Sequence, residues 1–476
     1  MYEIVKIFKY VIENGIFVYS ILIFSAYFIM SVISAFEIYR YMKKNSFIDY
    51  STIISSPLSP SISIIAPAYN EGKTIIENIR SLLSIHYNNF EVIIINDGSK
   101  DDSMEKIITH YELEKINVPY NSFIETKPVR GIYKSKNKAY NKLVVIDKEN
   151  GGKSDSLNAG INLCDKKYFA AVDVDCILEE DALLKMIKPF LEEPECRVIA
   201  AGGVIRIANS CKIEGGKIIE VNLSKKFLPR IQVIEYSRAF LMGRMAWSRL
   251  NGLLLISGAF GVFDREIALK SGGYDCKTVG EDMELIVRMR RYMIEHKLKY
   301  KVVYIPDPLC WTEVPETLKV LSRQRNRWTR GTIETLFKHK KLFFNKKYGN
   351  LGMLGHPYWL FFEWLAPIIE FLGIFYFILI AVMGHPNWPF FIVLLLFVYL
   401  FAVSFSVWAL LFEELTFRKY RRKRDVVRLI LTSFLEPVLY HPLNVWFALR
   451  GNFHYFIGKN LWGKMDRTGF TVNKET

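Results

Sequence analysis

The sequence has few cysteines, and they do not stand in the spacing of a metal-binding pair. All six lie between Cys164 and Cys310, without a C-x-x-C motif. This distribution argues against a zinc site and is not that of a disulfide framework. We therefore expect reduced cysteines in a cytosolic domain.

Charge is absent from one long stretch near the N-terminus. Ile16–Phe36 carries no charged residue and has about the length needed to cross a bilayer. No small-residue cleavage site accompanies it, so we expect a retained anchor rather than a signal peptide. Lys43 and Lys44 follow, and the positive-inside rule places the next segment in the cytoplasm.

A second hydrophobic region occupies the C-terminal part of this chain of net charge +15. Trp364–Met383 and Trp388–Phe412 have the length of two membrane spans. Val426–Ile457 is broken by Pro437 and Pro442, which favours a re-entrant or interfacial hairpin. The expected domains are an anchor at 1–45, a cytosolic domain with interfacial helices at 46–345, a transmembrane and re-entrant channel region at 346–458 and a cytosolic C-terminal segment at 459–476.

The central motif is an apolar run, Tyr168–Asp175, that ends in Asp173 and Asp175. Alternate residues of a strand point to the same side, so both carboxylates would lie together where open α/β sheets bind ligands. Close carboxylates repel unless a proton or a cation relieves them, and oxygen ligands suit Mg²⁺ or Mn²⁺. For the motif alone, a solvated turn is the alternative.

Upstream, the chain alternates strand, helix and strand over Ser61–Ala66, Thr74–Leu83 and Phe90–Ile95. Polar turns at strand ends are typical of a parallel, Rossmann-like nucleotide-binding sheet. Asp97 follows the second strand and either binds a nucleotide or belongs to the local cap of a helix starting near Ser103. Lys115–Asn150 shows no readable pattern.

A glycine-rich turn, Gly151–Gly160, leads toward the central motif and contains Lys153. Glycines allow the backbone to approach phosphates closely, and a lysine supplies a point charge. The spacing is not that of a P-loop. Lys153 and the two aspartates are therefore expected to flank one site.

Two further strands are expected at Ile199–Ile207 and Leu253–Phe263. The second contains Ser257 and Gly258, which suggest a wall without bulky side chains facing a ligand. Val279–Leu285 then opens a helix with acidic residues, which either stabilise the helix dipole or provide a general base, Asp282.

Gln324, Arg327 and Trp328 share one side of a later helix by their i, i+3, i+4 spacing. They would present a planar cation to a diphosphate and a broad π-face to a sugar ring. A nucleic-acid surface or a solvated basic face are the alternatives for this arginine-rich segment.

Taken together, these motifs resemble the processive family 2 glycosyltransferases, which include cellulose, hyaluronan, chitin and poly-N-acetylglucosamine synthases. The resemblance covers Ser61–Gly331, and its most specific piece is Gln324–Trp328. The other matching pieces, in the family's order, are Pro67–Glu71, Asn96–Gly98, the Lys153 turn, Asp173–Asp175 and Glu281–Asp282. Gly280 stands where cellulose synthases carry threonine.

The resemblance implies an α/β GT-A fold in the cytosolic domain, joined to an α-helical transmembrane region. It implies that Asp282, beside Glu281, deprotonates the acceptor. The implied donor-binding residues are Tyr69, Glu71, Asp97, Lys153, Asp173, Arg327 and Arg467; the acceptor-binding residues are Trp328, Gln324, Ser257 and Gly258; the ligands of Mg²⁺ or Mn²⁺ are Asp175 and Asp173. Trp462–Phe470 resembles a gating loop, the alternative being a disordered basic tail.

The sequence thus predicts a processive, inverting β-glycosyltransferase that uses a UDP-sugar and passes its polymer through its own channel. UDP-glucose, giving a β-glucan, is the preferred donor, and UDP-N-acetylglucosamine polymerisation or transfer to a polyprenyl phosphate are alternatives. A membrane-tethered scaffold for nucleic acid or anionic lipid is the non-enzyme alternative. The expected partners are the UDP-sugar, the growing polysaccharide and membrane lipid, without nucleic acid; accessory secretion subunits are left open. The expected location is the cell membrane, with several passes and a cytoplasmic catalytic domain.

Overall fold

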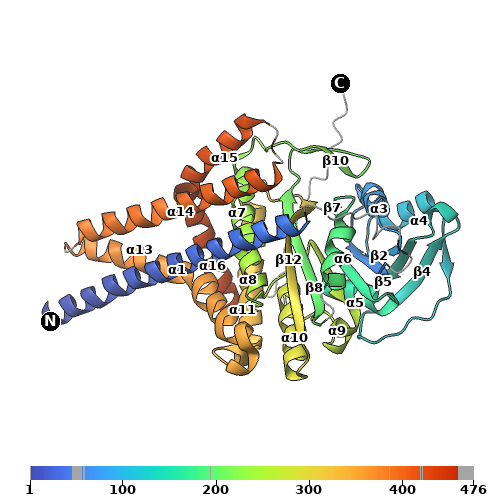
Figure 1. Cartoon of the computed structure of the whole chain (residues 1–476), viewed down its shortest axis with the longest axis horizontal. Helices are drawn as coiled ribbons and strands as arrows, with labels where there is room; N and C mark the ends of the chain where they lie inside the picture. Colours follow the sequence, from blue (N-terminus) through green and yellow to red (C-terminus); the bar gives the residue numbers. More distant parts are fainter. Residues whose placement is uncertain are drawn as a thin grey trace.

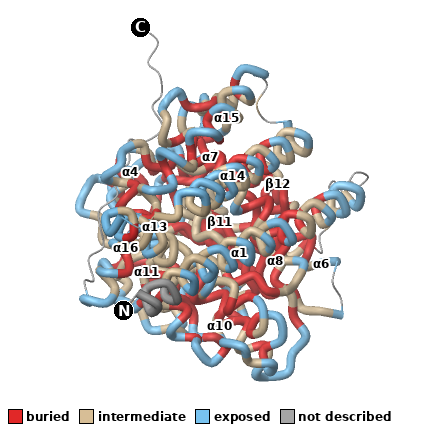
Figure 2. The backbone as a smooth tube through the Cα atoms, turned by 90° about the vertical axis from the view of Figure 1, so that its left-hand side faces the viewer, coloured by how far each residue is buried: buried red, intermediate tan, exposed pale blue. Residues whose placement is uncertain are grey.

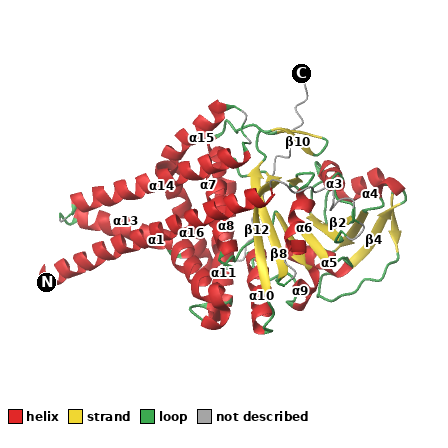
Figure 3. Cartoon of the chain, in the orientation of Figure 1, coloured by secondary structure: helices red, strands yellow, loops and turns green. Residues whose placement is uncertain are grey.

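An α/β body and a group of long helices make up the molecule in this computed structural model (Figure 1). The structure describes residues 2–45, 56, 59–192, 195–384, 386–418, 420 and 422–458. The body lies at one end, and helices α1, α13 and α14 project from it side by side toward the other (Figures 1 and 3).

The body is organised around a ten-stranded sheet of order β3-β4-β5-β2-β1-β6-β11-β8-β12-β7. Strands β5, β2, β1 and β6 are parallel neighbours, and β11 runs antiparallel to both β6 and β8. The strands are β1 Ile62–Ala68, β2 Phe90–Asp97, β3 Leu113–Ile116, β4 Val129–Ser135, β5 Leu143–Lys148, β6 Tyr168–Val172, β7 Ile177–Leu178, β8 Arg197–Ile207, β11 Phe260–Asp264 and β12 Tyr300–Thr312, and a separate hairpin pairs β9 Lys212–Glu214 with β10 Lys217–Glu220.

Helices cover the sheet and connect it to the projecting bundle. Those of the body are α3 Ile75–Leu83, α4 Ser103–Tyr111, α5 Lys153–Leu163, α6 Ala182–Glu192, α7 Phe227–Ser237, α8 Met245–Arg249, α9 Arg265–Lys270, α10 Glu281–Glu295 and α11 Leu318–Lys338. The others are α1 Tyr2–Asn45, α12 His356–Tyr358, α13 Ala366–Val382, α14 Trp388–Phe417, α15 Lys423–Leu435 and α16 His441–Phe456. Short 3₁₀ turns are η1 Lys138–Tyr140, η3 Lys340–Leu342 and η4 Lys346–Tyr348, and π-helical segments are η2 Arg238–Arg244, η5 Leu351–Gly355, η6 Trp359–Trp364 and η7 Glu436–Tyr440.

Most of the expected elements form as predicted, and one strand does not. Leu253–Phe263 was expected to be a single strand, but only Phe260–Asp264 pairs in the sheet. Leu253 and Leu254 are fully buried, so the apolar run reflects burial of an irregular segment in the core rather than strand pairing. The unassigned Lys115–Asn150 contains β4 and β5, which complete one side of the sheet.

Four helical stretches in the described chain have the length and apolar composition needed to cross a membrane: Lys9–Asn45, Leu351–Val382, Trp388–Phe417 and Lys423–Phe456. Ring stacking joins two of them, with the centroids of Phe24 and Phe401 at 4.2 Å. Seen from the side of these helices, buried residues gather in the body around β11, β12 and α8 (Figure 2).

The last helical stretch was expected to re-enter the membrane or lie at its interface. Here α16 packs along α11 of the body, and Tyr440 and Phe447 share a buried cluster with Leu321. It does not project with α13 and α14 (Figure 1). The whole stretch Lys423–Phe456 is long and apolar enough to span a membrane, so the re-entrant or interfacial assignment of Val426–Ile457 stays a prediction.

Buried ion pairs join the body to the projecting helices. Arg206, near the end of β8, pairs with Glu413 of α14 at 2.9 Å. Arg238 of η2 pairs with Glu436 of η7 at 3.0 Å. In each pair both side chains are at most about one-fifth exposed, so the charges are desolvated and depend on each other.

Helices α10 and α11 touch through two glycines. A Cβ atom on Gly280 would lie 2.6 Å from the Cα atom of Gly331, and one on Gly331 would lie 2.7 Å from that of Gly280. The two backbones therefore approach more closely than side chains would allow. This contact brings the start of α10, with Glu281 and Asp282, against the middle of α11.

Gly280→Ala should destabilise the protein, because its methyl group would meet backbone rather than a movable side chain. Overpacking of this kind costs about 1–3 kcal/mol. We expect a lower unfolding temperature in detergent and reduced turnover. Gly15→Ala is the matched control, since a Cβ there meets nothing within 4 Å. Equal stability of both variants would contradict the close contact.

Candidate active site

A single cavity of about 2870 Å³ begins at the carboxyl ends of β1, β2 and β6 and continues between the projecting helices. Nearly all of the residues predicted for the site line it. They are Tyr69, Glu71, Asp97, Lys153, Asp173, Asp175, Ser257, Gly258, Glu281, Asp282, Gln324, Arg327 and Trp328. Arg467 and the gating-loop-like segment Trp462–Phe470 lie outside the described residues.

The turn after β1 is fixed by the neighbouring turn after β2. The amide of Asn70 donates to Ser99 at 3.0 Å, and the amide of Glu71 donates to the Ser103 hydroxyl at 2.9 Å. Asn70 has a φ of 56°, a left-handed conformation that asparagine tolerates better than most residues. Tyr69 is thereby held at the cavity wall, 41% exposed.

Asp97, at the end of β2, shapes the glycine-rich turn. Its carboxylate accepts hydrogen bonds from the amides of Gly151 and Gly152 at 2.9 and 2.8 Å. It also accepts from Lys148 at 2.8 Å and from the Asn150 side chain at 3.1 Å. These protein donors occupy much of its hydrogen-bonding capacity, so direct nucleotide binding by Asp97 remains a prediction. Sequence reasoning missed Lys148, whose side chain is fully buried, because its pairing with the distant Asp97 leaves no pattern along the chain.

Lys153 begins α5 and reaches a group of carboxylates. Its Nζ pairs with Asp173 and lies 3.3 Å from the carbonyl oxygen of Gly258. Burial opposes the charge of Lys153, but the carboxylates of Asp173, Glu281 and Asp282 outweigh that effect and raise its pKa. The lysine therefore stays charged and offsets part of the local negative charge.

The expected metal ligands lie close together. Asp173, Asp175 and Cys176 each offer a ligand atom within 4.8 Å of the other two. The carboxylates match the oxygen ligands that Mg²⁺ and Mn²⁺ prefer. A hydrogen bond to Cys310 and burial raise the pKa of the Cys176 thiol, so it stays protonated and adds no anionic ligand. The donor set fits a hard divalent cation held by the two aspartates.

Asp282 is oriented by two backbone amides. Its Oδ2 accepts from Gly258 at 3.0 Å, and its Oδ1 accepts from Met283 at 2.9 Å. A Cβ on Gly258 would lie 3.0 Å from the Lys153 Nζ and 3.3 Å from Asp282, so glycine allows this approach. Burial, and then the neighbouring Asp282, raise the pKa of Glu281. The pair thus combines a partly exposed carboxylate, Asp282, with a buried one, Glu281.

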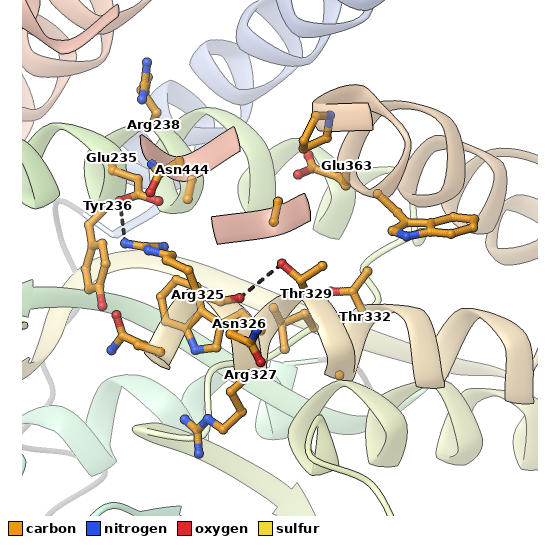
Figure 4. Close-up of a pocket in the computed structure, with 18 of the residues that line it drawn as sticks. Glu235, Tyr236, Arg238, Arg325, Asn326, Arg327, Thr329, Thr332, Glu363 and Asn444 are labelled. Atoms are coloured by element: carbon orange, nitrogen blue, oxygen red, sulfur yellow. Dashed lines mark hydrogen bonds and ion pairs between the residues drawn. The ribbon is translucent and has the colours of Figure 1, made fainter. Parts of the chain in front are cut away.

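Helix α11 and the helices beyond it form the side of the cavity where acceptor-binding residues are predicted. Gln324 is buried and Trp328 is 40% exposed. Figure 4 shows Arg327, Asn326 and Glu363 around the same space. Trp364 and Glu370 also line the cavity, and Glu370 lies 2.8 Å from His441.

Comparison with known proteins identifies the class to which this fold and site belong. The chain belongs to glycosyl transferase family group 2, whose pattern matches residues 169–411, and the pattern of glycosyl transferase family 2 matches residues 63–249. The expected family resemblance is confirmed.

The chain is similar to two poly-β-1,6-N-acetyl-D-glucosamine synthases. It is 31% identical to the one from Staphylococcus epidermidis and 29% identical to the one from Staphylococcus aureus (strain COL) over 278 residues. The match covers 58% of this chain and 56% of each relative, so the chain spans little more than half the length of these relatives.

A solved mannosyltransferase from Pyrobaculum calidifontis, in complex with GDP-mannose and Mn²⁺, shares the fold. The TM-score is 0.52 at 15% identity, over 94% of this chain and all of that one. This similarity supports the fold alone. With the family matches, it confirms the GT-A type of α/β fold.

A charged network holds the helix that carries Asp282. The buried carboxylate of Glu284 lies 2.7 Å from both Arg288 and Lys338, and 3.2 Å from His339. Burial opposes its ionisation, but the hydrogen bond from His339 and the charge of Arg288 lower the pKa of Glu284 from 4.5 to about 2. That lowering corresponds to about 3 kcal/mol of stabilisation at neutral pH.

Glu284→Gln should therefore destabilise the protein by about 2–3 kcal/mol at pH 7. Since the folded-state pKa is depressed, the stabilisation is present above about pH 4.5 and is lost as the pH falls toward 2. Thermal unfolding from pH 7 to pH 3.5 should show the variant and the wild type converging. Glu77→Gln is the control, because Glu77 forms an exposed pair with Arg80. A constant difference across pH would contradict this assignment.

Proposed function

We propose that this protein is a membrane glycosyltransferase that polymerises N-acetylglucosamine from UDP-N-acetylglucosamine. The main support for this proposal is that one cavity extends without a break from the carboxylate cluster to the space between the projecting helices. A single transfer would need no such passage beyond Trp328. The protein would cross the cell membrane several times, with the α/β body in the cytoplasm and the glycan leaving through the passage.

UDP-N-acetylglucosamine replaces UDP-glucose as the proposed donor. That preference finds no support, because the relatives named above are N-acetylglucosamine polymer synthases. The alternative predicted from sequence, an N-acetylglucosamine polymer, is therefore the better proposal, and a β-glucan is not proposed further.

The two aspartates that follow β6 would hold the metal cofactor. Asp173 and Asp175 would bind Mg²⁺ or Mn²⁺, in keeping with their donor set. When bound, the cation would supply positive charge to the diphosphate of the departing nucleotide. Lys153 and Arg327, which line the same cavity, would add fixed positive charge there.

In the transfer step, Asp282 would accept the proton of the attacking acceptor hydroxyl. The acceptor oxygen forms a bond to the anomeric carbon as the bond from that carbon to the diphosphate breaks, and UDP leaves with the electron pair. Attack from the opposite face inverts the configuration. The amide of Gly258 would keep the Asp282 carboxylate pointed into the cavity, and Trp328 would support the terminal sugar.

Asp282→Asn should lower turnover at least about 10²-fold, because it removes proton acceptance while preserving shape. Affinity for UDP, measured by calorimetry, should stay nearly unchanged. Glu281→Gln is the matched comparison and should lose less activity. The assignment of the base would be wrong if the Glu281 variant were inactive and the Asp282 variant were not.

A donor panel tests the function directly. Purified protein in lipid nanodiscs, given Mg²⁺ or Mn²⁺, should release UDP from UDP-N-acetylglucosamine and form a polymer cleaved by a hydrolase specific for β-1,6-linked N-acetylglucosamine. EDTA should stop release reversibly. Turnover with UDP-glucose alone, or a glycolipid product after addition of polyprenyl phosphate, would overturn the proposal.

A further inference from the structure

Arg325 covers one face of the Trp328 indole. The guanidinium carbon lies 4.2 Å from the ring centroid, within the range of a cation–π contact. Arg325 is 7% exposed, whereas Trp328 is 40% exposed and lines the cavity. The exposed part of the indole is therefore its opposite face and edge.

Two elements outside α11 hold the guanidinium in this place. The Nη2 atom of Arg325 donates to Glu235 of α7 at 2.7 Å and to the Tyr440 hydroxyl of η7 at 3.2 Å. Tyr440 in turn donates to Glu235 at 2.9 Å. Figure 4 shows the pairing of Glu235 with Arg325 at the cavity wall. Three groups thus form a closed triangle behind the indole.

The triangle keeps the Arg325 guanidinium charged although it is largely shielded from solvent. Burial opposes the charge of Arg325, but Glu235 and Tyr440 outweigh that effect and raise its pKa. Tyr440 belongs to a π-helical segment, a rare local geometry that often occurs at functional sites. The same segment carries Glu436, which pairs with Arg238, so one ion pair and the hydrogen bond from Tyr440 to Glu235 fix it against η2 and α7.

We propose that Arg325 is the positioning residue of the acceptor platform: held by Glu235 and Tyr440, it closes one face of Trp328 so that the terminal sugar stacks only on the opposite face. This inference rests on the proposed function. Its consequence is a fixed orientation of the acceptor relative to Asp282. A lysine could keep the ion pair with Glu235, but it has no planar group to lie along the ring.

The decisive variant is therefore Arg325→Lys, compared with Arg330→Lys. Arg330 is buried in the same helix and lies 3.8 Å from Glu334, which makes the second variant a control for the loss of a buried arginine. The probe is a tetramer of β-1,6-linked N-acetylglucosamine, and its affinity is measured calorimetrically on UDP-saturated protein in nanodiscs. Product length, UDP release and unfolding temperature are measured on the same samples.

We expect Arg325→Lys to bind the tetramer about 10-fold more weakly and to make shorter products, with UDP affinity unchanged. Tyr440→Phe should show the same effect to a smaller extent. The Arg325→Lys, Trp328→Ala double variant should be no worse than Trp328→Ala, because Arg325 acts through the indole. Arg330→Lys should elongate like the wild type.

Normal tetramer binding and elongation by Arg325→Lys would overturn the inference, as would additive losses in the double variant. Loss of UDP binding and stability together with elongation would show a purely structural role and overturn it as well. A wild-type protein that releases no UDP from any sugar donor would overturn the proposed function instead, so the two failures are distinguishable.

Discussion

The site depends on the convergence of like charges. Asp173 follows β6, Glu281 and Asp282 begin α10, and the three carboxylates meet around Lys153, whose charge they stabilise. Such a group of carboxylates repels itself unless cations lie within it. The glycine-rich turn before α5 positions Lys153, and Asp97 fixes this turn by accepting hydrogen bonds from its amides. The ends of β2 and β6 and the start of α10 are thus electrostatically interdependent.

Much of the site could be predicted because its residues follow local rules. Asp173 and Asp175 end a buried strand, and the two-residue period of a strand gives them a common side. What could not be predicted depends on packing between distant segments. The Lys148–Asp97 and Arg325–Glu235 pairs carry no pattern along the chain, since their members lie 51 and 90 residues apart. The sequence pattern predicts a strand for Leu253–Ala259, which is irregular in the structure, because a buried apolar run looks the same in a strand and in an irregular core segment.

The α/β body and the helical bundle form one mechanical unit. Arg206–Glu413 and Arg238–Glu436 are desolvated pairs that cross the boundary between them. Separating the two parts would expose uncompensated charges in a largely apolar region, which is strongly unfavourable. Gln324 and Trp328 of α11 therefore keep a fixed relation both to the carboxylates and to the part of the cavity between the projecting helices.

The contact between Gly280 and Gly331 makes the residue allowed at each of these positions depend on the other. Each glycine occupies space that a side chain on the other would need. A threonine at the position of Gly280, the residue that cellulose synthases carry there, would need space that the backbone of Gly331 occupies in this structure. The spacing between the start of α10, which carries Asp282, and the middle of α11, which carries Trp328, therefore depends on both of these positions lacking a side chain.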